Sequence, residues 1–379
     1  MHKPRDVRRT FEDHGLTPKK WMGQNLLVDP VYLDRIIAAA GVEPGEAIVE
    51  VGAGLGVLTE SLAAAGARVW AIELDAGFFR VLQDKLGKRA EIHLIHADAL
   101  RYDFRSLAAE LGMLRVVANL PYNISSRLIF MFITERDIFK SLTILLQQEV
   151  AERLAAMPGS REYGMLSVLL SATATIESLF SIPGRAFLPR TEVTSSLVRI
   201  SFPESPPVAV SDRKLFVRLV KAAFTGRRKT LRNTLKNAKV PGVPYETLLD
   251  LAATGGIDLS RRAETVSAAE FGVFTDAVSR CIDEGSSDRV NKIRKERPDQ
   301  GQLKDLGIDD WGRWECEPST FPWQYADDET AYVFEGRVTV KTDAGDSVDI
   351  GAGDLVTFPK GMKCTWTVHE TIRKMYKFG

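Results

Sequence analysis

Short apolar runs alternate with amphipathic stretches over the first two hundred residues. We predict strands at 48–51, 67–74, 91–95, 116–118, 142–146 and 196–201, and helices at 31–40 and 78–86. Apolar strands that alternate with helices are typical of a parallel sheet covered on both faces. The pattern therefore predicts an α/β fold in which ligands bind beyond the carboxyl ends of the strands.

The pattern changes twice further along the chain. Helices are predicted at 214–223, 230–239, 245–252 and 268–281, and residues 284–302, with nine charged side chains, have the composition of an exposed linker. From residue 321 apolar and polar residues alternate in AYVFEGRVTVKT, DSVDIG, DLVTFP and CTWTVH, which predicts a small all-β barrel or sandwich. We expect domains at 1–203, 204–283 and 303–379, joined by a linker at 284–302.

Composition narrows the class of protein. The 379 residues contain 45% hydrophobic side chains, enough for several buried cores, yet no apolar run is long enough for a transmembrane helix. The charged N-terminus lacks the apolar stretch of a signal peptide. Cys281, Cys316 and Cys364 are widely separated and form no zinc spacing or disulfide framework, so a cytoplasmic location is expected.

Charge is unevenly distributed although its sum is zero. Residues 211–239 contain ten Lys or Arg against one acid, a net charge of +9, whereas residues 303–379 contain nine against fourteen, a net charge of −5. The basic segment is a candidate polyanion-binding surface.

The chain is organised around IVEVGAGLGVLTE at 48–60, where a strand, a glycine turn and a helix follow one another. Gly52 and Gly54 would let a ligand approach the backbone and the helix N-terminus. The loop alone fits nicotinamide, flavin and S-adenosylmethionine binders, or a plain structural turn. Glu73, at the end of the next strand, is placed to bind ribose hydroxyls, and Asp98 to accept from an adenine amine. The alternatives are a solvated acid for Glu73 and a helix cap for Asp98.

The tetrapeptide Asn119-Leu120-Pro121-Tyr122 follows a buried strand. The Asn119 side-chain oxygen and a carbonyl near Leu120 can both accept from one amino group, and Tyr122 can stack on a base. Two acceptors would free the lone pair of an exocyclic aromatic amine for attack on a sulfonium methyl, so catalysis would be mainly positioning and electrostatics. The alternative is a turn that only ends the strand.

Over residues 19–281 the chain resembles the ribosomal RNA adenine dimethyltransferases of the KsgA family. GQNLL (23–27), GAGLGVLT (52–59), IELD (72–75), HADAL (96–100), NLPYNIS (119–125), YGMLSV (163–168), AFTGRRKTLRNTLK (223–236) and RAETVS (262–267) follow in the family's order. The resemblance implies a Rossmann-like class I methyltransferase whose cofactor is S-adenosylmethionine. It assigns the cofactor to Gln24, Asn25, Leu27, Gly52, Gly54, Glu73, Asp98 and Asn119, and the target adenine to Asn119, Pro121, Tyr122 and Phe187.

The sequence departs from the family in the loop after Phe187. Arg190, Thr191, Glu192 and Thr194 replace the usual proline run and Lys-Val-Asp-Ser, so rigidity and contacts of this loop are open. The basic segment is interpreted as an RNA-binding surface formed by Arg227, Arg228, Lys229, Arg232 and Lys236. Helical spacing would put residues 228, 232 and 236 on one face.

The C-terminal segment resembles a small cupin. Glu329, Gly336, Gly353, Pro359 and Gly361 keep the cupin motif spacing, but the metal-binding histidines are replaced. Glu329 and Cys364 are too few for a confident metal site, and we expect a barrel without metal.

The resemblance implies dimethylation of N6 on two adjacent adenosines near the 3′ end of 16S ribosomal RNA, with the small subunit as partner. We expect a monomer that does not contact membranes. The alternatives are a ribosome-assembly or RNA-binding factor that does not methylate, a 23S ribosomal RNA adenine methyltransferase and, more distantly, a nicotinamide dehydrogenase.

Overall fold

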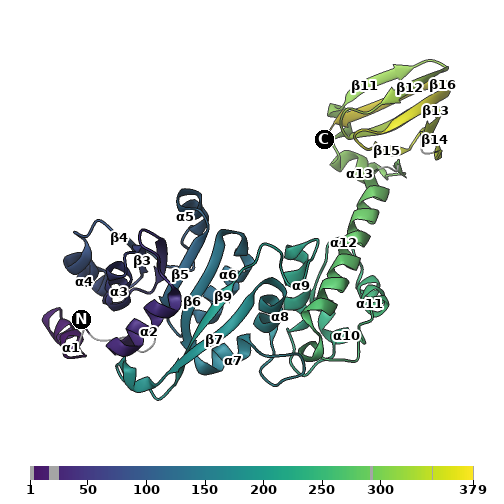
Figure 1. Ribbon diagram of the computed structural model, residues 1–379. Coiled ribbons are helices and arrows are strands. Elements are labelled where there is room, and N and C mark those ends of the chain that lie inside the picture. Colours follow the sequence, from purple (N-terminus) through teal and green to yellow (C-terminus); the bar gives the residue numbers. More distant parts are fainter. Residues whose placement is uncertain (1–3, 17–24, 291–292, 344, 379) are drawn as a thin grey trace. The chain divides into compact units, whose positions relative to one another are not determined.

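The computed structural model describes residues 4–16, 25–290, 293–343 and 345–378. The chain forms two compact units that meet between Ser279 and Arg280. In Figure 1 the first unit runs from purple to green and the second from green to yellow.

The first unit is built on a seven-stranded sheet with the order β4-β3-β2-β5-β6-β9-β7. The chain moves outward from β2 through β3 to β4, then returns to the other side of β2 with β5. The carboxyl ends of β2 and β5 therefore flank the point where the strand order reverses, which is where open α/β sheets bind ligands. The strands are β2 (Ala47–Val51), β3 (Arg68–Glu73), β4 (Ile92–His96), β5 (Leu114–Asn119), β6 (Phe139–Gln147), β7 (Thr175–Ile182) and β9 (Ser195–Ser201).

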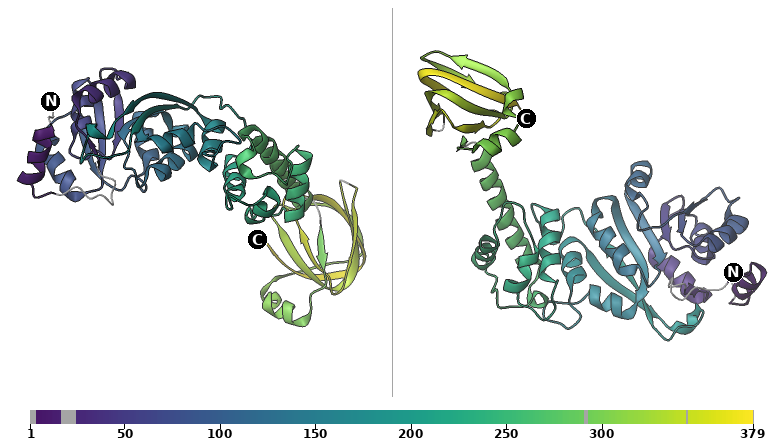
Figure 2. Two further views of the ribbon diagram at one scale, coloured as in Figure 1. Left: turned by 90° about the horizontal axis from the view of Figure 1, so that it is seen from below. Right: turned by 180° about the vertical axis from the view of Figure 1, so that it is seen from behind.

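Both faces of this sheet are buried, and helices lie on either side (Figures 1 and 2). On one face Ile48 and Val69 pack in a core with residues of α2, α3 and α4. On the other, aromatic rings from α5, α6 and β6 pack edge to face, with Phe132 and Phe139 centred 5.0 Å apart. The helices of this part are α1 (Pro4–Asp13), α2 (Pro30–Ala40), α3 (Val57–Ala64), α4 (Ala76–Leu86), α5 (Phe104–Leu111), α6 (Ser125–Thr134), α7 (Gln148–Leu154) and α8 (Met165–Thr173).

The predicted strands are confirmed, but the sheet is not wholly parallel. β9 runs antiparallel to β6, and β7, which was not predicted, runs antiparallel to β9 at the edge. The reason β7 was missed is that most of its residues are exposed or half-buried, so it lacks the apolar run of a central strand. A small two-stranded ladder joins β1 (Leu26–Leu27) to β8 (Phe187–Leu188).

The helical part of the first unit contains α9 (Arg213–Ala223), α10 (Leu231–Thr234), α11 (Tyr245–Thr254) and α12 (Ala268–Val290). The single helix expected at 230–239 was wrong: α10 spans four residues and continues as a 3-10 turn at Leu235–Asn237. Threonine and asparagine, found at 233, 234 and 237, are poor helix formers. The first two amides of α10, which have no partner inside the helix, donate to the carbonyls of Arg261 and Leu259.

The segment expected as a linker contains regular structure at both ends. α12 extends into its first part and ends at Val290, and β10 (Arg294–Glu296) pairs with a strand of the C-terminal sheet. A highly charged composition is shared by linkers and by protected edge strands, so it did not distinguish the two.

The second unit is an all-β domain whose strands pair antiparallel. The four predicted strands are present, and β16 is long enough to pair with β11, β12 and β13 in turn. A separate core includes Val340, Phe358 and Trp366. The strands are β11 (Gly312–Cys316), β12 (Ser319–Gln324), β13 (Glu329–Thr342), β14 (Ser347–Gly351), β15 (Leu355–Phe358) and β16 (Lys363–Phe378), preceded by α13 (Gln300–Asp305).

Candidate active site

A cavity of about 200 Å³ lies at the carboxyl ends of the central strands. It gathers residues from the glycine loop, the ends of β3 and β5, the turn after β4 and the start of α6. Of the residues predicted to form the site, it brings together Asn25, Gly52, Gly54, Glu73, Asp98, Asn119 and Pro121.

The glycine loop is tightly enclosed. Gly52 and Gly54 have φ values of 78° and 60°, a region that side-chain-bearing residues rarely adopt. A Cβ on Gly52 would lie 3.0 Å from Pro121 Cγ, and one on Gly54 would lie 2.6 Å from a Leu26 methyl carbon. A side chain at either position would therefore collide with Pro121 or Leu26, so the loop needs glycine to pack against these two residues.

Glu73 organises the same loop. Its carboxylate accepts from the Gly54 amide at 2.8 Å and from the Asp75 amide at 2.7 Å. Burial raises the pKa of Glu73 above its ordinary value, and these amide hydrogen bonds oppose that rise. Glu73 thus connects the end of β3 to the glycine loop while facing the cavity.

Asp98 lies in the turn after β4. Its Oδ1 accepts from the Leu100 amide at 3.0 Å, and the side chain stays partly exposed at the cavity. Residues that sequence reasoning missed form the apolar part of the lining, among them Leu74, Ala99 and Leu100. Leu74 was predicted as the last residue of a buried strand, but β3 ends at Glu73 and Leu74 is 49% exposed beside the cavity. The sequence carried no signal that separates it from the strand.

Asn119 holds the most informative position. Its Nδ2 donates to the carbonyl of Asn25 at 2.8 Å, which orients the amide. Its Oδ1 is buried and has no hydrogen-bond partner among the residues that the structure describes. Buried acceptors are normally satisfied, so this oxygen is placed to receive a donor from a ligand.

The remaining predicted residues lie elsewhere or outside the described part of the chain. Tyr122 is half-buried and its hydroxyl lies 2.8 Å from Ser195 Oγ. Leu27 and Phe187, paired across β1 and β8, are both in the hydrophobic core and do not line the cavity. Phe187 is only 1% exposed, so its ring offers no open face in this structure. Gln24 falls outside the described residues.

The loop at 190–194, where the sequence departs from the family pattern, is anchored at both ends. The Thr191 amide donates to the Gly184 carbonyl at 3.3 Å, and the Thr194 carbonyl accepts from the Gln148 amide at 3.0 Å. A Cβ on Gly184 would lie 1.8 Å from the Thr191 carbonyl oxygen, so the two backbones are in close contact.

A buried carboxyl group lies beneath the glycine loop. Glu50 on β2 is 2% exposed and accepts from Thr59 Oγ1 of α3 at 2.5 Å. Burial raises the pKa of Glu50 to about 8, against the lowering effect of that hydrogen bond. Glu50 therefore joins the strand before the glycine loop to the helix after it.

The basic surface is exposed but is not one helical face. Arg228, Lys229 and Arg232 are exposed, and Arg228 precedes α10 while Lys236 lies in the following 3-10 turn. The predicted alignment of residues 228, 232 and 236 along one helix is therefore wrong. Arg227 differs from the others, because its guanidinium donates to the Arg161 carbonyl at 2.6 Å.

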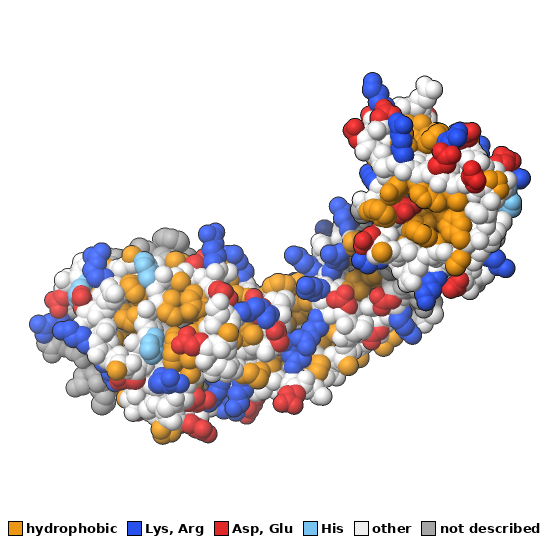
Figure 3. Space-filling model, turned by 90° about the horizontal axis from the view of Figure 1, so that it is seen from above, with side chains coloured by type: hydrophobic (Ala, Val, Ile, Leu, Met, Phe, Trp, Pro, Cys, Tyr) orange, Lys and Arg blue, Asp and Glu red, His pale blue; other side chains and the backbone are white. Residues whose placement is uncertain are grey.

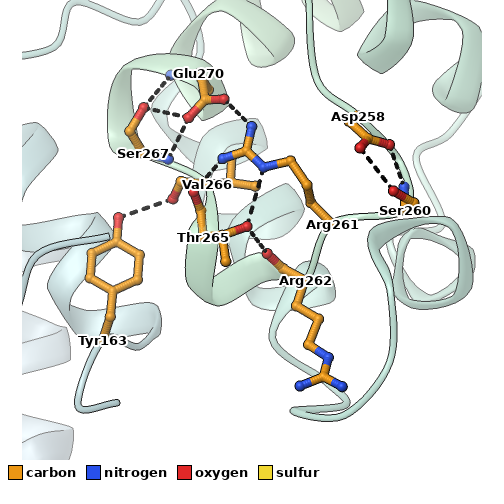
Figure 4. Close-up of polar contacts among 9 residues, drawn as sticks. All are labelled: Tyr163, Asp258, Ser260, Arg261, Arg262, Thr265, Val266, Ser267 and Glu270. Atoms are coloured by element: carbon orange, nitrogen blue, oxygen red, sulfur yellow. Dashed lines mark hydrogen bonds and ion pairs between the residues drawn. The ribbon is translucent and has the colours of Figure 1, made fainter. Parts of the chain in front are cut away.

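Polar contacts hold the segment 258–270 in place beside this surface (Figure 4). Arg261 Nη1 donates to Glu270 at 2.5 Å, and Glu270 also accepts from Ser267 Oγ at 2.8 Å. The Tyr163 hydroxyl donates to the Val266 carbonyl at 3.1 Å, and burial raises the pKa of Tyr163 to about 12, which keeps it a donor. The two motifs YGMLSV and RAETVS are thus joined directly.

The interior of the C-terminal unit holds an ion pair rather than a cluster of metal ligands. Lys374 Nζ donates to Glu329 at 2.5 Å, and both side chains are buried. Burial raises the pKa of Cys364 to about 11. Among the described residues no three His, Cys, Asp or Glu side chains are grouped to hold a metal ion.

One face of this unit carries a broad hydrophobic patch (Figure 3).

The sheet order, the glycine loop and the cavity define a Rossmann-like α/β methyltransferase fold. The family described as ribosomal RNA adenine dimethylase matches residues 15–273, and a EutQ-like cupin domain matches residues 303–376. The chain therefore belongs to the ribosomal RNA adenine dimethylase family and carries an additional C-terminal cupin domain.

Relatives support this assignment over most of their length. A ribosomal RNA small subunit methyltransferase A from Magnetococcus marinus is 42% identical over 266 residues, which cover 70% of this chain and 93% of the relative. One from Desulfitobacterium hafniense is 40% identical over 283 residues, covering 75% and 100%. A dimethyladenosine transferase structure from Plasmodium falciparum shares the fold, with a TM-score of 0.55 at 24% identity, covering 69% of this chain and 98% of that one.

In the part of the chain that the structure describes, we find no helix long and apolar enough to cross a bilayer.

Proposed function

We propose that this protein uses S-adenosylmethionine to dimethylate N6 of two adjacent adenosines near the 3′ end of 16S ribosomal RNA in the small ribosomal subunit. The observation that carries the proposal is the Asn119 Oδ1 acceptor, which is buried, fixed in orientation by the Asn25 carbonyl and lacks a donor among the described residues. An amine of the target base would supply that donor.

The cavity residues fit the proposed cofactor. Gly52 and Gly54 line the cavity, and Glu73 and Asp98 face it at the end of β3 and in the turn after β4. When bound, S-adenosylmethionine would supply an electrophilic methyl group. Leu74, Ala99 and Leu100 would provide apolar contacts for its adenine ring.

The protein's own contribution to the chemistry is positioning. Asn119 Oδ1 would accept a hydrogen bond from the amine and favour the tetrahedral geometry that exposes the nitrogen lone pair. Because the amine proton becomes acidic only after the methyl is transferred, no strong base is required. The hydrogen bond of Tyr122 to Ser195 would hold the phenol ring beside the target base.

The substrate assignment rests on the relatives and on the basic surface. The relatives' names specify the small subunit, and Arg228, Lys229 and Arg232 present exposed cations to a polyanion. We further propose that the protein acts as a cytoplasmic monomer, with a methyltransferase domain at 1–203 and an RNA-binding domain at 204–283. Phe187 would have to become accessible to stack on the target base.

The test is methyl transfer to undermethylated small subunits by Asn119→Ala. The control is Gln83→Ala, which removes an exposed amide from α4 outside both the cavity and the basic surface. We expect the first variant to lose about 10²- to 10³-fold in turnover, as when one stabilising hydrogen bond is removed from an active site, with nearly unchanged RNA affinity. Full turnover by Asn119→Ala would refute the role of this residue.

The choice of RNA is tested separately by mass mapping of both ribosomal RNAs from a deletion strain. Loss of a 16S mark is expected. Loss of a 23S mark alone would favour the large-subunit alternative, and cofactor binding without any product would favour an assembly factor.

A further inference from the structure

A second cavity lies in the first unit, away from the candidate active site. It has a volume of about 490 Å³ and is enclosed by the ends of α6 and α8, the loop before α9 and the first turns of α9. Its apolar wall is formed by Ile133, Leu169, Ala172, Val208, Phe216 and Val217.

Its position separates this cavity from the chemistry proposed above. Asn119 ends β5, whereas Arg136, which lines the second cavity, lies in the turn before β6 begins. β5 and β6 are parallel, with Leu114 opposite Phe139 and Asn119 opposite Leu145. The two cavities are therefore at opposite ends of the strands β5 and β6.

Three cations, Arg136, Arg213 and Lys214, line this cavity and form what we call its cationic wall. Among the described residues that line it there is no aspartate or glutamate. Asp212 caps α9 by accepting from the Leu215 amide at 2.9 Å. Asp137 accepts from Arg105 at 2.8 Å, and it acts on Arg136 and Arg213 only through space.

Arg136 is the unusual member of the cationic wall. Arg136 is only 5% exposed. Of its guanidinium nitrogens only Nη2 donates a hydrogen bond, to the Pro203 carbonyl, among the described residues. Neither Nε nor Nη1 has a partner among the described residues. Asp137 favours the charged form of Arg136 through space, but among the described residues no carboxylate forms a hydrogen bond or ion pair with it. A buried guanidinium with unsatisfied donors is costly unless an anion binds to them. Burial, and next the neighbouring Arg213, lower the pKa of Arg136, as expected for cations held together.

The chemistry of the ligand follows from the two walls. Three cations without lining acids favour a dianion over a singly charged carboxylate, and guanidinium groups match the oxygens of a phosphate. The apolar wall would bury an uncharged body, and the volume falls in the range of small-molecule sites. A bare phosphate of an RNA backbone would leave that wall uncovered.

We propose that this cavity binds a small organic phosphate monoester, with the phosphate on the cationic wall and the uncharged body against the apolar wall. The site is independent of the methyl-transfer reaction, so it stands or falls separately from the proposed function.

Isothermal titration of the full-length protein with phenyl phosphate tests the site, with phenol and inorganic phosphate as probes that each lack one half of the ligand. We expect saturable binding of phenyl phosphate and at least about tenfold weaker binding of each half. Arg136→Met should weaken phenyl phosphate binding at least about tenfold. Arg218→Met removes an exposed charge from α9 outside the cavity, and it should leave phenyl phosphate binding unchanged.

If Arg136→Met does not fold, Arg213→Met and Lys214→Met carry the test, because both residues are exposed at the mouth of the cavity. The proposal is overturned if phenyl phosphate shows no saturable binding to the wild-type protein, or if these variants bind it as the wild type does. It is also overturned if the variants lose affinity only for RNA.

Discussion

At the scale of single residues, the first unit contains buried polar side chains that have few hydrogen-bond partners. The buried Oδ1 of Asn119 has no hydrogen-bond donor among the described residues. The carboxyl group of Glu50 is buried beneath the glycine loop. Such groups cost stability unless they are satisfied, so each has a measurable signature.

Glu50 should make stability depend on pH. Its pKa is about 8 in the folded protein against 4.5 for an ordinary glutamate, so the folded state retains a proton that the unfolded chain has released. Between these values stability falls as pH rises, by at most about 1.4 kcal/mol per pH unit, and it levels off above about pH 8. Urea unfolding from pH 5 to 9 should show a flatter profile for Glu50→Gln, while the exposed control Glu110→Gln keeps the wild-type slope. Equal slopes for Glu50→Gln and wild type would contradict this account.

The ion pair of Glu329 and Lys374 should behave as a unit. Removing one partner leaves a buried unpaired charge, so Glu329→Gln should destabilise the C-terminal unit by about 3–5 kcal/mol. Replacing both residues, as Glu329→Gln with Lys374→Met, removes both buried charges and should restore most of that loss. Denaturant unfolding of the two variants compares them, and a double variant no more stable than the single one would argue against coupling.

At the scale of elements, the strands could be predicted from the sequence better than the helices of the basic segment. Central strands have short, nearly continuous apolar runs followed by turn residues, whereas β7 at the edge carries no such signal. α10 changes to a 3-10 turn after Thr234, and the local spacing of apolar and charged residues carries no signal of that change.

The same limit applied to the candidate site. Strand-end residues such as Glu73 and Asp98 were predictable because parallel strands end at one edge. The burial of Phe187 and Leu27 comes from the pairing of β1 with β8, across 160 residues of sequence, and could not be inferred from either segment alone. Lys374 was likewise missed as the partner of Glu329, 45 residues away.

The basic surface should act through charge although it is not one helical face. Arg228→Glu with Arg232→Glu should weaken binding to small subunits and reduce the dependence of affinity on salt, because fewer counterions are released. The charge-matched control is Arg80→Glu on α4 with Lys88→Glu in the turn after it. Both residues are exposed, and this variant should bind almost normally. Filter binding at several salt concentrations measures both, and equal losses in the two variants would remove this surface from the RNA-binding site.

At the scale of the whole molecule, two units with separate cores should unfold separately. Val49 lies in the first unit and Val340 in the core of the second, each at most 1% exposed. Calorimetry of the full chain should show two unfolding transitions. Val49→Ala should lower the melting temperature of one and Val340→Ala that of the other, each through a loss of about 1–3 kcal/mol in the free energy of unfolding. A chain ending at Val290, which keeps α12 whole, should retain the first transition; a single transition shifted by both variants would show that the units fold together.

One contact in the first unit links two binding events. The Gly52 backbone lies so close to Pro121 that a single added carbon would touch the proline ring. If the donor and the target base bind as proposed, a donor that fixes the glycine loop in this position would therefore also fix the tetrapeptide proposed to receive the purine. By thermodynamic reciprocity, whatever factor the donor adds to the affinity for the purine, the purine must return to the affinity for the donor.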